Sequence, residues 1–271
     1  MLTKIIHEDN VSRSYELIDT AERIVILTHL SPDGDAIGSS LALYHFLKEV
    51  GKNSVVIVPN RFPSFFNWMS GATEIVILEE NPKEVQALIA DADLLIAVDF
   101  NDLKRIDGVK PFVEQSQAKK ILIDHHLFPE AFADVTISHP EISSTSELVF
   151  RLICRMGFCQ QITKDCAEAI YVGMMTDTGN FSYASQSPEI YNIISELLTK
   201  GIDKDNIYRL VYNTYSEHRI RLMGYCLLEK MKLYKEQRTA VISLSLEELE
   251  RFEYQIGDVE GFVNIPLSIE G

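Results

Sequence analysis

His29, Asp33 and Asp35 lie within seven residues of one another, between the apolar run 23–27 and the helix-like run 36–50. The intervening Pro-Asp-Gly-Asp is typical of a turn, so these side chains should share one loop. In open α/β sheets, ligands bind beyond the carboxyl ends of the strands. Imidazole and carboxylate groups together can hold a divalent metal. The alternative is that the aspartates only shape the turn or cap the next helix.

The same pattern recurs further along the chain. Two more apolar runs, 94–98 and 121–123, end in acidic residues or histidines, and a helix-like segment supplies another acidic residue. These residues are Asp99, Asp124, His125, His126 and Asp177. Because the chain has only 7 histidines, we interpret the recurrence as one shared site.

This set of side chains suits a pair of divalent ions. Two ions about 3.5–4 Å apart, bridged by one carboxylate, can drive the in-line attack of water on a phosphoester. Six side chains supply enough ligands for such a pair: His29, Asp33, Asp35, Asp99, His125 and Asp177. Imidazole and carboxylate without thiolate favour Mn²⁺ over structural zinc. Mg²⁺ and Co²⁺ are the alternatives.

A layered fold is needed to bring these residues together. Strand-like and helix-like segments alternate over about 120 residues, which predicts an α/β fold with a mostly parallel sheet and helices on both faces. The strands are nearly continuous apolar runs, as expected where both faces are covered. Strands are expected at 23–28, 54–58, 74–78, 94–98, 120–123 and 133–138, and helices at 8–21, 36–50, 82–90 and 111–117.

The pattern changes after residue 142. Ser144 and Glu147 fit a capping box at a helix start, and the free N–H groups there could also hold an anion; both interpretations stay open. Further helices are expected at 163–178, 188–200, 203–213 and 216–236, then a strand at 239–245, a helix at 246–252 and a strand at 261–269.

We therefore predict three parts: a catalytic domain at 1–215, a helical connector at 216–236, and the start of a smaller α/β C-terminal domain at 237–271. The last part holds roughly 35 residues, too few for an independent core. We expect that this domain is cut short.

The composition narrows the class of ligand. The net charge is −15 and the pI about 4.9, which excludes long nucleic acid because such binding depends on many Lys and Arg contacts. A small phosphate ligand held through metal ions is compatible with this charge. No apolar run approaches the ~18 residues of a membrane span, and the polar N-terminus does not resemble a signal peptide.

Two other groups of residues have plain structural interpretations. The 4 cysteines form no Cys-x-x-Cys pair, so we expect buried, unpaired thiols and a reduced, cytoplasmic setting. An aromatic cluster favours core or interface packing over a base-stacking platform. It consists of Phe62, Phe65, Phe66, Trp68 and Met69.

Four motifs, taken in order, resemble those of the DHH phosphoesterase superfamily. They are His-x-x-x-Asp-Gly-Asp from His29, the strand-end Asp99, Asp-His-His from Asp124, and Thr-Asp-Thr-Gly from Thr176. The run ending at Phe181, with the later segment 260–267, looks most like the bacterial nanoRNase (oligoribonuclease) branch. Members of that branch hydrolyse oligoribonucleotides of a few residues, and often 3'-phosphoadenosine 5'-phosphate. The resemblance covers nearly the whole chain.

The resemblance implies a role for each motif residue. It assigns one Mn²⁺ to His29, Asp33 and Asp99. It assigns the second to Asp35, Asp99, His125 and Asp177, so that Asp99 bridges the two ions.

Three further side chains take roles around the ions in this resemblance. His126 would contact the scissile phosphate and offset its developing charge. Asp124 would orient a histidine ligand, and Arg105 would reach a substrate phosphate. With Asp99, the first two make up the expected catalytic set.

The expected reaction is the hydrolysis of short RNA to 5'-mononucleotides, and of 3'-phosphoadenosine 5'-phosphate to AMP. Alternatives are a cyclic-dinucleotide phosphodiesterase, an exopolyphosphatase or pyrophosphatase, and a non-catalytic nucleotide-binding module. The expected partner is a short RNA or small nucleotide, with no long nucleic acid and no membrane; whether the chain forms a homodimer is open. The Gly-Gly-Gly-His segment of the family's second domain is absent from the 271 residues, so we expect an incomplete grip on substrate.

Overall fold

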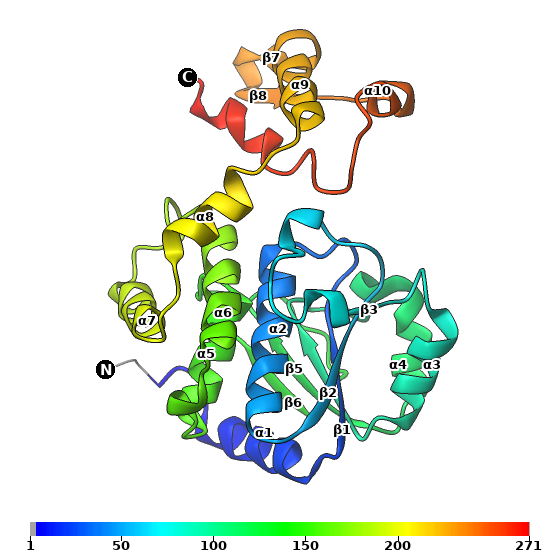
Figure 1. Cartoon of the computed structure of the whole chain (residues 1–271), viewed down its shortest axis with the longest axis vertical. Coiled ribbons are helices and arrows are strands. Elements are labelled where there is room, and N and C mark those ends of the chain that lie inside the picture. The colour runs from blue at the N-terminus through cyan, green and yellow to red at the C-terminus, as the bar shows by residue number, and fades with distance from the viewer. Residues whose placement is uncertain (1–3, 271) are drawn as a thin grey trace. The chain divides into compact units, whose positions relative to one another are not determined.

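The computed structural model describes residues 4–270 and divides into two compact units (Figure 1). The first unit comprises the chain up to Arg61 together with Phe66–Ile207. The second comprises Phe62–Phe65 and the chain from Tyr208 onward.

The first unit is built on a six-stranded sheet in which every neighbouring pair is parallel, in the order β3-β2-β1-β4-β5-β6. This confirms the predicted α/β fold. Strand order reverses between β1 and β4, and such a switch point is where open α/β sheets bind ligands. The strands are β1 (Arg23–Leu27), β2 (Asn53–Val58), β3 (Val76–Ile77), β4 (Leu94–Val98), β5 (Lys119–Asp124) and β6 (Val135–Ser138).

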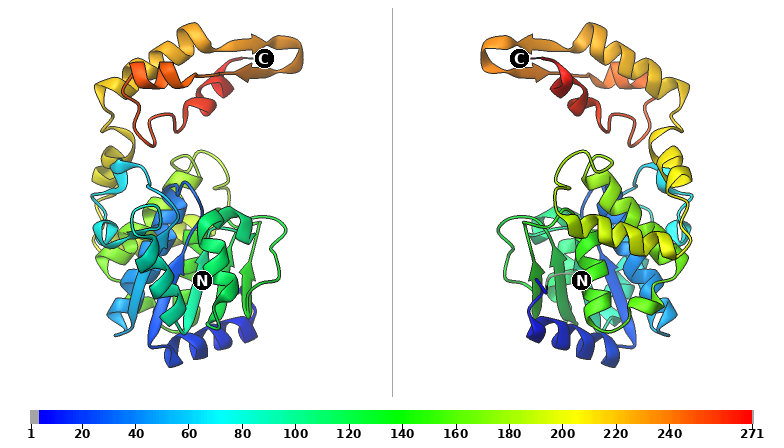
Figure 2. Two further views of the ribbon diagram at one scale, coloured as in Figure 1. Left: turned by 90° about the vertical axis from the view of Figure 1, so that its right-hand side faces the viewer. Right: turned by 90° about the vertical axis from the view of Figure 1, so that its left-hand side faces the viewer.

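Helices cover both faces of this sheet (Figure 1 and Figure 2). Val25 and Leu27 of β1 pack into a core that includes Val85, Ile89 and Val113, which lie on α3 and α4. The other face of the sheet packs against α2 and α5, and α6 packs against both of these helices. The helices of this unit are α1 (Glu8–Thr20), α2 (Gly34–Glu49), α3 (Pro82–Asp91), α4 (Lys110–Gln115), α5 (Thr145–Arg155), α6 (Lys164–Asp177) and α7 (Pro188–Thr199).

Helices α2 and α6 approach each other closely through glycines. A Cβ atom added to Gly38 of α2 would lie 2.6 Å from the carbonyl oxygen of Ala169 on α6. A Cβ atom added to Gly173 of α6 would lie 2.6 Å from a carboxylate oxygen of Asp35. The absence of side chains at these positions therefore lets the two helices bring their acidic residues together.

The second unit begins in α8 (Lys204–Tyr212) and continues through α9 (Glu217–Tyr225). The buried Arg219 of α9 donates to the carbonyl oxygens of Gly257 and Glu260, at 2.6 and 2.8 Å, and lies over the ring of Tyr215. It thereby ties the last part of the chain to this helix. The remaining elements are a π-helical turn (Cys226–Lys230), the antiparallel ribbon β7 (Lys232–Tyr234) and β8 (Thr239–Val241), and α10 (Leu246–Arg251).

Two predicted elements near the C-terminus are wrong. The strand expected at 261–269 is a 3₁₀ helix, Phe262–Ser268. Gly261 precedes it in a left-handed conformation (φ 78°), and Pro266 within it has no N–H to donate to a sheet. The helix expected at 216–236 ends at Lys230, because the following residues pair as the β7–β8 ribbon.

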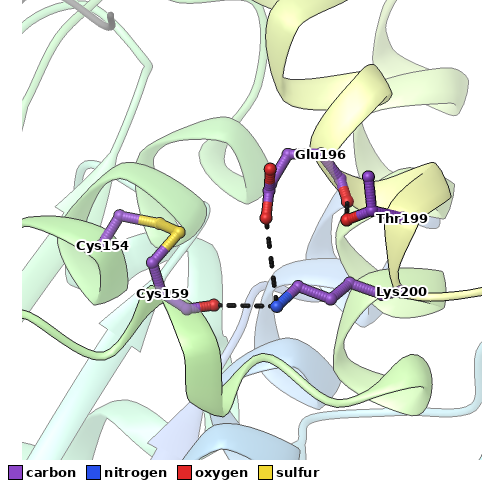
Figure 3. Close-up of a disulfide and its surroundings, with 5 residues drawn as sticks. All are labelled: Cys154, Cys159, Glu196, Thr199 and Lys200. Carbon is purple, nitrogen blue, oxygen red and sulfur yellow. Dashed lines mark hydrogen bonds and ion pairs between the residues drawn. A yellow bond between two sulfur atoms is a disulfide. The ribbon is translucent and has the colours of Figure 1, made fainter.

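The prediction of four unpaired cysteines is also wrong. Cys166 and Cys226 are buried free thiols, but Cys154 and Cys159 form a disulfide (Figure 3). The chain turns at Gly157, where φ is 93°, and this brings the two cysteine Cα atoms to 4.2 Å. The cysteine pattern thus gives no argument for a reducing compartment, and the cytoplasmic setting stays a prediction. Within residues 4–270, none of the helices has the length and apolar character needed to cross a bilayer.

Candidate metal centre

His29 lies in the loop after β1 and points its Nε2 atom into the site. Its Nδ1 is 2.8 Å from the carbonyl oxygen of Leu30, which fixes the ring. Nε2 is buried and makes no hydrogen bond; it lies 3.5 Å from Asp99 Oδ2 and 3.8 Å from Asp33 Oδ1. A buried nitrogen without a partner, facing two carboxylates, is the environment expected of a metal ligand.

Asp33 caps a helix and also faces the candidate site. Its Oδ1 accepts from the backbone N–H groups of Asp35 and Ala36, both at 3.0 Å, and so caps α2. The same carboxylate is half exposed and faces His29 Nε2. Capping therefore fixes this carboxylate at the edge of the site without closing it to a cation.

Asp99 follows β4 and lies at the centre of the cluster. Its side chain is 2% exposed, and its backbone has a left-handed φ of 64°, which is uncommon for a residue other than glycine. Oδ2 faces His29, whereas Oδ1 lies 3.7 Å from His125 Nε2. Oδ1 also accepts a 2.9 Å hydrogen bond from the hydroxyl of Thr145. The two oxygens thus face two different histidines.

The Asp124-His125-His126 run lies at the end of β5, and its side chains contact different partners. His125 Nδ1 is 3.2 Å from the carbonyl oxygen of Ile142, so that Nε2 points inward. His126 Nδ1 is 2.7 Å from the buried carboxylate of Asp124, which also accepts from the His126 backbone N–H. Asp124, expected to orient a metal-ligating histidine, therefore orients His126. About a third of the His126 side chain is exposed to solvent.

The N-terminus of α5 holds the fully buried Asp35. The backbone N–H groups of Thr145 and Ser146 donate to its two carboxylate oxygens at 2.6 and 2.9 Å. The sequence left open whether this helix start holds an anion. It holds one from the chain itself, the carboxylate of Asp35. Ser144 caps the helix as predicted, but the Glu147 side chain pairs with Ser143 and Arg151 rather than completing the capping box. Sequence reasoning missed Thr145, whose only signal was its place in a Ser/Thr run at a helix start.

Asp177 completes the cluster from the last residue of α6. Its Oδ2 lies 3.2 Å from His125 Nε2. Three sets of side chains bring potential ligand atoms within 4.8 Å of one another: His29 with Asp33 and Asp99, Asp35 with His125 and Asp177, and Asp99 with His125 and His126. All six predicted metal ligands are thus brought together.

The electrostatics of the cluster favour a bound cation. Burial, followed by the neighbouring carboxylates, raises the pKa of Asp99 well above its usual range and that of Asp177 to about 8. Burial also raises the pKa of Asp35 and lowers that of His29. Four crowded carboxylates and two imidazoles form an oxygen- and nitrogen-donor set that fits Mn²⁺ or Mg²⁺. Divalent cations would offset the cost of burying these carboxylates beside one another.

The remaining predicted residues have separate outcomes. Arg105 is half buried, and it lies close enough to His29 for its charge to lower the pKa of that histidine. The carbonyl oxygen of Arg105 accepts from the Leu30 N–H. Phe66 and Met69 are buried, which confirms a core function for that part of the aromatic cluster. Phe65 lies 5.7 Å from the Arg219 guanidinium within the second unit.

The chain is similar in sequence to known proteins. A model of the DHH family, N-terminal domain, matches residues 23–174. The bifunctional oligoribonuclease and PAP phosphatase NrnA of Thermus thermophilus is 36% identical over 182 residues, which make up 66% of this chain and 50% of that protein. The cyclic-di-AMP phosphodiesterase GdpP of Bacillus subtilis is 27% identical over 252 residues, covering 88% of this chain and 36% of that protein.

A solved structure is considerably more similar. The exopolyphosphatase-related protein from Bacteroides fragilis is 58% identical, with a TM-score of 0.95, over 99% of this chain and 79% of that chain. By contrast, this chain spans about half the length of the curated relatives that it matches, such as the Thermus protein at 50%.

Proposed function

This chain belongs to the DHH family of phosphoesterases, and from that premise we propose that it hydrolyses short oligoribonucleotides to 5'-mononucleotides, and 3'-phosphoadenosine 5'-phosphate to AMP. The relative from Thermus thermophilus, named for these two activities, supports the choice of substrates. The strongly acidic composition supports a short substrate, because long nucleic acid needs a basic surface.

The placement of Asp99 carries the proposal. One carboxylate oxygen faces His29 and Asp33, and the other faces His125, which is beside Asp35 and Asp177. This arrangement supports two cation positions that share Asp99. His29, Asp33 and Asp99 would hold one ion, and Asp35, Asp99, His125 and Asp177 the other.

Two divalent ions, when bound, supply a nucleophilic water near neutral pH and offset the charge that develops on the phosphate. The residues of the chain position these charges. Thr145 and the start of α5 fix Asp99 and Asp35, and the carbonyl oxygen of Ile142 fixes His125. The orphan nitrogen of His29 and the donor set make Mn²⁺ our first choice, with Mg²⁺ or Co²⁺ as alternatives.

His126 is the residue that we assign to the scissile phosphate. Asp124 holds its Nδ1 and leaves Nε2 for a ligand. An imidazolium balanced by a buried carboxylate can donate from Nε2 to a phosphate oxygen, and this interaction strengthens as negative charge develops there. Arg105, whose charge acts on His29, would add a second positively charged side chain for a substrate phosphate.

A cyclic dinucleotide is the second candidate substrate, favoured by the similarity to GdpP over 88% of this chain. The centre described above would serve either phosphodiester. The two candidate substrates differ in the shape of the nucleotide, and the metal cluster itself does not discriminate between these shapes.

A substrate panel tests the proposal. The chain is incubated with Mn²⁺ and 5'-phosphorylated diadenylate, 3'-phosphoadenosine 5'-phosphate, cyclic di-AMP or tetrapolyphosphate, and the products are separated by chromatography. We expect AMP from the first two substrates and none after chelation. Asp99→Asn should abolish turnover and metal binding, whereas Asp165→Asn, at the exposed far end of α6, should change neither. Hydrolysis of polyphosphate alone, or full activity in the chelator, would refute the proposal.

A further inference from the structure

The loop that follows the Asp-His-His run presents an unusual aromatic side chain. Phe128 is 86% exposed, and its backbone has a left-handed φ of 61°. Both properties oppose stability: a bulky side chain rarely adopts this backbone conformation, and the ring gains nothing from burial. Strained residues of this kind occur preferentially at ligand sites.

Hydrogen bonds hold the loop in place on both sides of Phe128. Asn101 Nδ2 donates to the carbonyl oxygen of Leu127 at 2.6 Å, and the N–H of Glu130 donates to the carbonyl oxygen of Asn101 at 2.7 Å. The Glu130 carboxylate also accepts from the Leu103 N–H at 3.3 Å. The segment that follows Asp99 therefore fixes the loop, so the ring projects from a held backbone.

The position of the ring relative to His126 suggests what it contacts. His126 and Phe128 are two positions apart in the chain, so their Cα atoms lie at most about 7 Å from each other. A nucleotide whose phosphate lies against His126 carries its base at a comparable distance from that phosphate. An exposed ring beside a phosphate site is suited to stack on a base, because every base offers a π-face.

We propose that Phe128 is the specificity residue that stacks on the nucleobase of the bound substrate. This inference rests on the proposed function and deepens it, because it makes the substrate class a nucleotide rather than an inorganic polyphosphate. The stacked base belongs to the nucleotide whose phosphate His126 contacts.

AMP and ribose 5-phosphate form a matched pair of probes, since they differ only in the base. Their dissociation constants are measured by calorimetry on the whole chain with Mn²⁺. We expect the wild type to prefer AMP, Phe128→Leu to reduce that preference by about 5- to 10-fold, and Phe128→Trp to retain it. Tyr191→Leu, which removes a half-exposed ring from α7, should leave the preference unchanged.

The outcomes separate the two proposals. An unchanged ratio of the two constants in Phe128→Leu, with Mn²⁺-dependent ribose 5-phosphate binding intact, overturns the stacking inference alone. Loss of Mn²⁺ dependence in the wild type overturns the proposed function and the inference with it. If Phe128→Leu changes the sedimentation of the protein rather than the ratio of the two dissociation constants, Phe128 makes a protein contact. That result would also overturn the stacking inference.

Discussion

At the scale of single residues, the centre depends on the groups that hold the ligands as much as on the ligands themselves. His29 and His125 each use Nδ1 on a backbone carbonyl oxygen, so that both present Nε2 inward. Asp35 depends on the start of α5 in the same way. These supports come from segments far apart in the chain. Sequence alone therefore indicated the candidate ligands but not Thr145 or the carbonyl of Ile142.

Asp124→Asn tests the support of His126. The substitution removes the negative charge beside Nδ1 but leaves the six clustered ligands in place. We expect kcat to fall by about 10- to 100-fold, while the content of bound Mn²⁺ per chain stays the same. Activity assays and elemental analysis measure the two quantities, with Asp165→Asn as the surface control. Loss of metal in Asp124→Asn would contradict the assigned function of this carboxylate.

At the scale of elements, the close approach of α2 and α6 positions Asp35 and Asp177. Gly38→Ala would place a methyl group against the backbone of Ala169, which cannot move without shifting the helix. We expect a loss of about 1–3 kcal/mol in the free energy of unfolding, together with weaker Mn²⁺ binding.

Gly224→Ala is the matched control, since Gly224 lies in α9 and, apart from the adjoining backbone of its own helix, no atom lies within 4 Å of the added methyl group. It should be neutral or stabilise by up to about 1 kcal/mol, because alanine favours helix more than glycine does. Calorimetric scans of both variants measure the difference. Equal effects of the two substitutions would show that helix propensity, and not the contact between helices, decides the outcome at Gly38.

The same scale shows what the sequence could and could not predict. Runs such as 94–98 and 121–123 are recognisable because buried parallel strands are apolar throughout, and the two strands pair in parallel, so they end at the same edge of the sheet. The run 261–269 is also rich in apolar residues, yet Pro266 and the left-handed Gly261 direct it into a 3₁₀ helix. Cys154 and Cys159 pair because a turn at Gly157 brings them together, which a search for Cys-x-x-Cys spacing does not detect.

At the scale of the whole molecule, the chain carries a net charge of −15, and part of that negative charge is confined to the centre. The raised pKa values of Asp35, Asp99 and Asp177 mean that the folded chain holds protons more tightly there than the unfolded chain does. Stability from these groups is therefore present at low pH and is lost as pH rises through the folded pKa values, up to about 8 for Asp177. The divalent cations that we propose would replace those protons.

We accordingly expect the melting temperature of the metal-free chain to fall between about pH 5 and pH 8 relative to the Mn²⁺-loaded chain. The gap between the two forms should widen with pH, by about 2–4 °C for each kcal/mol of cation binding. Scanning calorimetry with chelator or Mn²⁺ at several pH values measures this gap. A difference in melting temperature that stays constant with pH would show that these carboxylates do not bind the cation. Asp165→Asn should reproduce the wild-type dependence of melting temperature on pH.

The left-handed backbone of Asp99 has a consequence for how this protein can vary. Glycine or asparagine would adopt that conformation more readily, and either would remove a buried negative charge. In the metal-free chain, either replacement would therefore raise thermal stability, and the aspartate is kept at a cost to that stability. Variants selected for heat resistance in the presence of a chelator should accumulate changes at Asp99, and should lose catalysis as they do so.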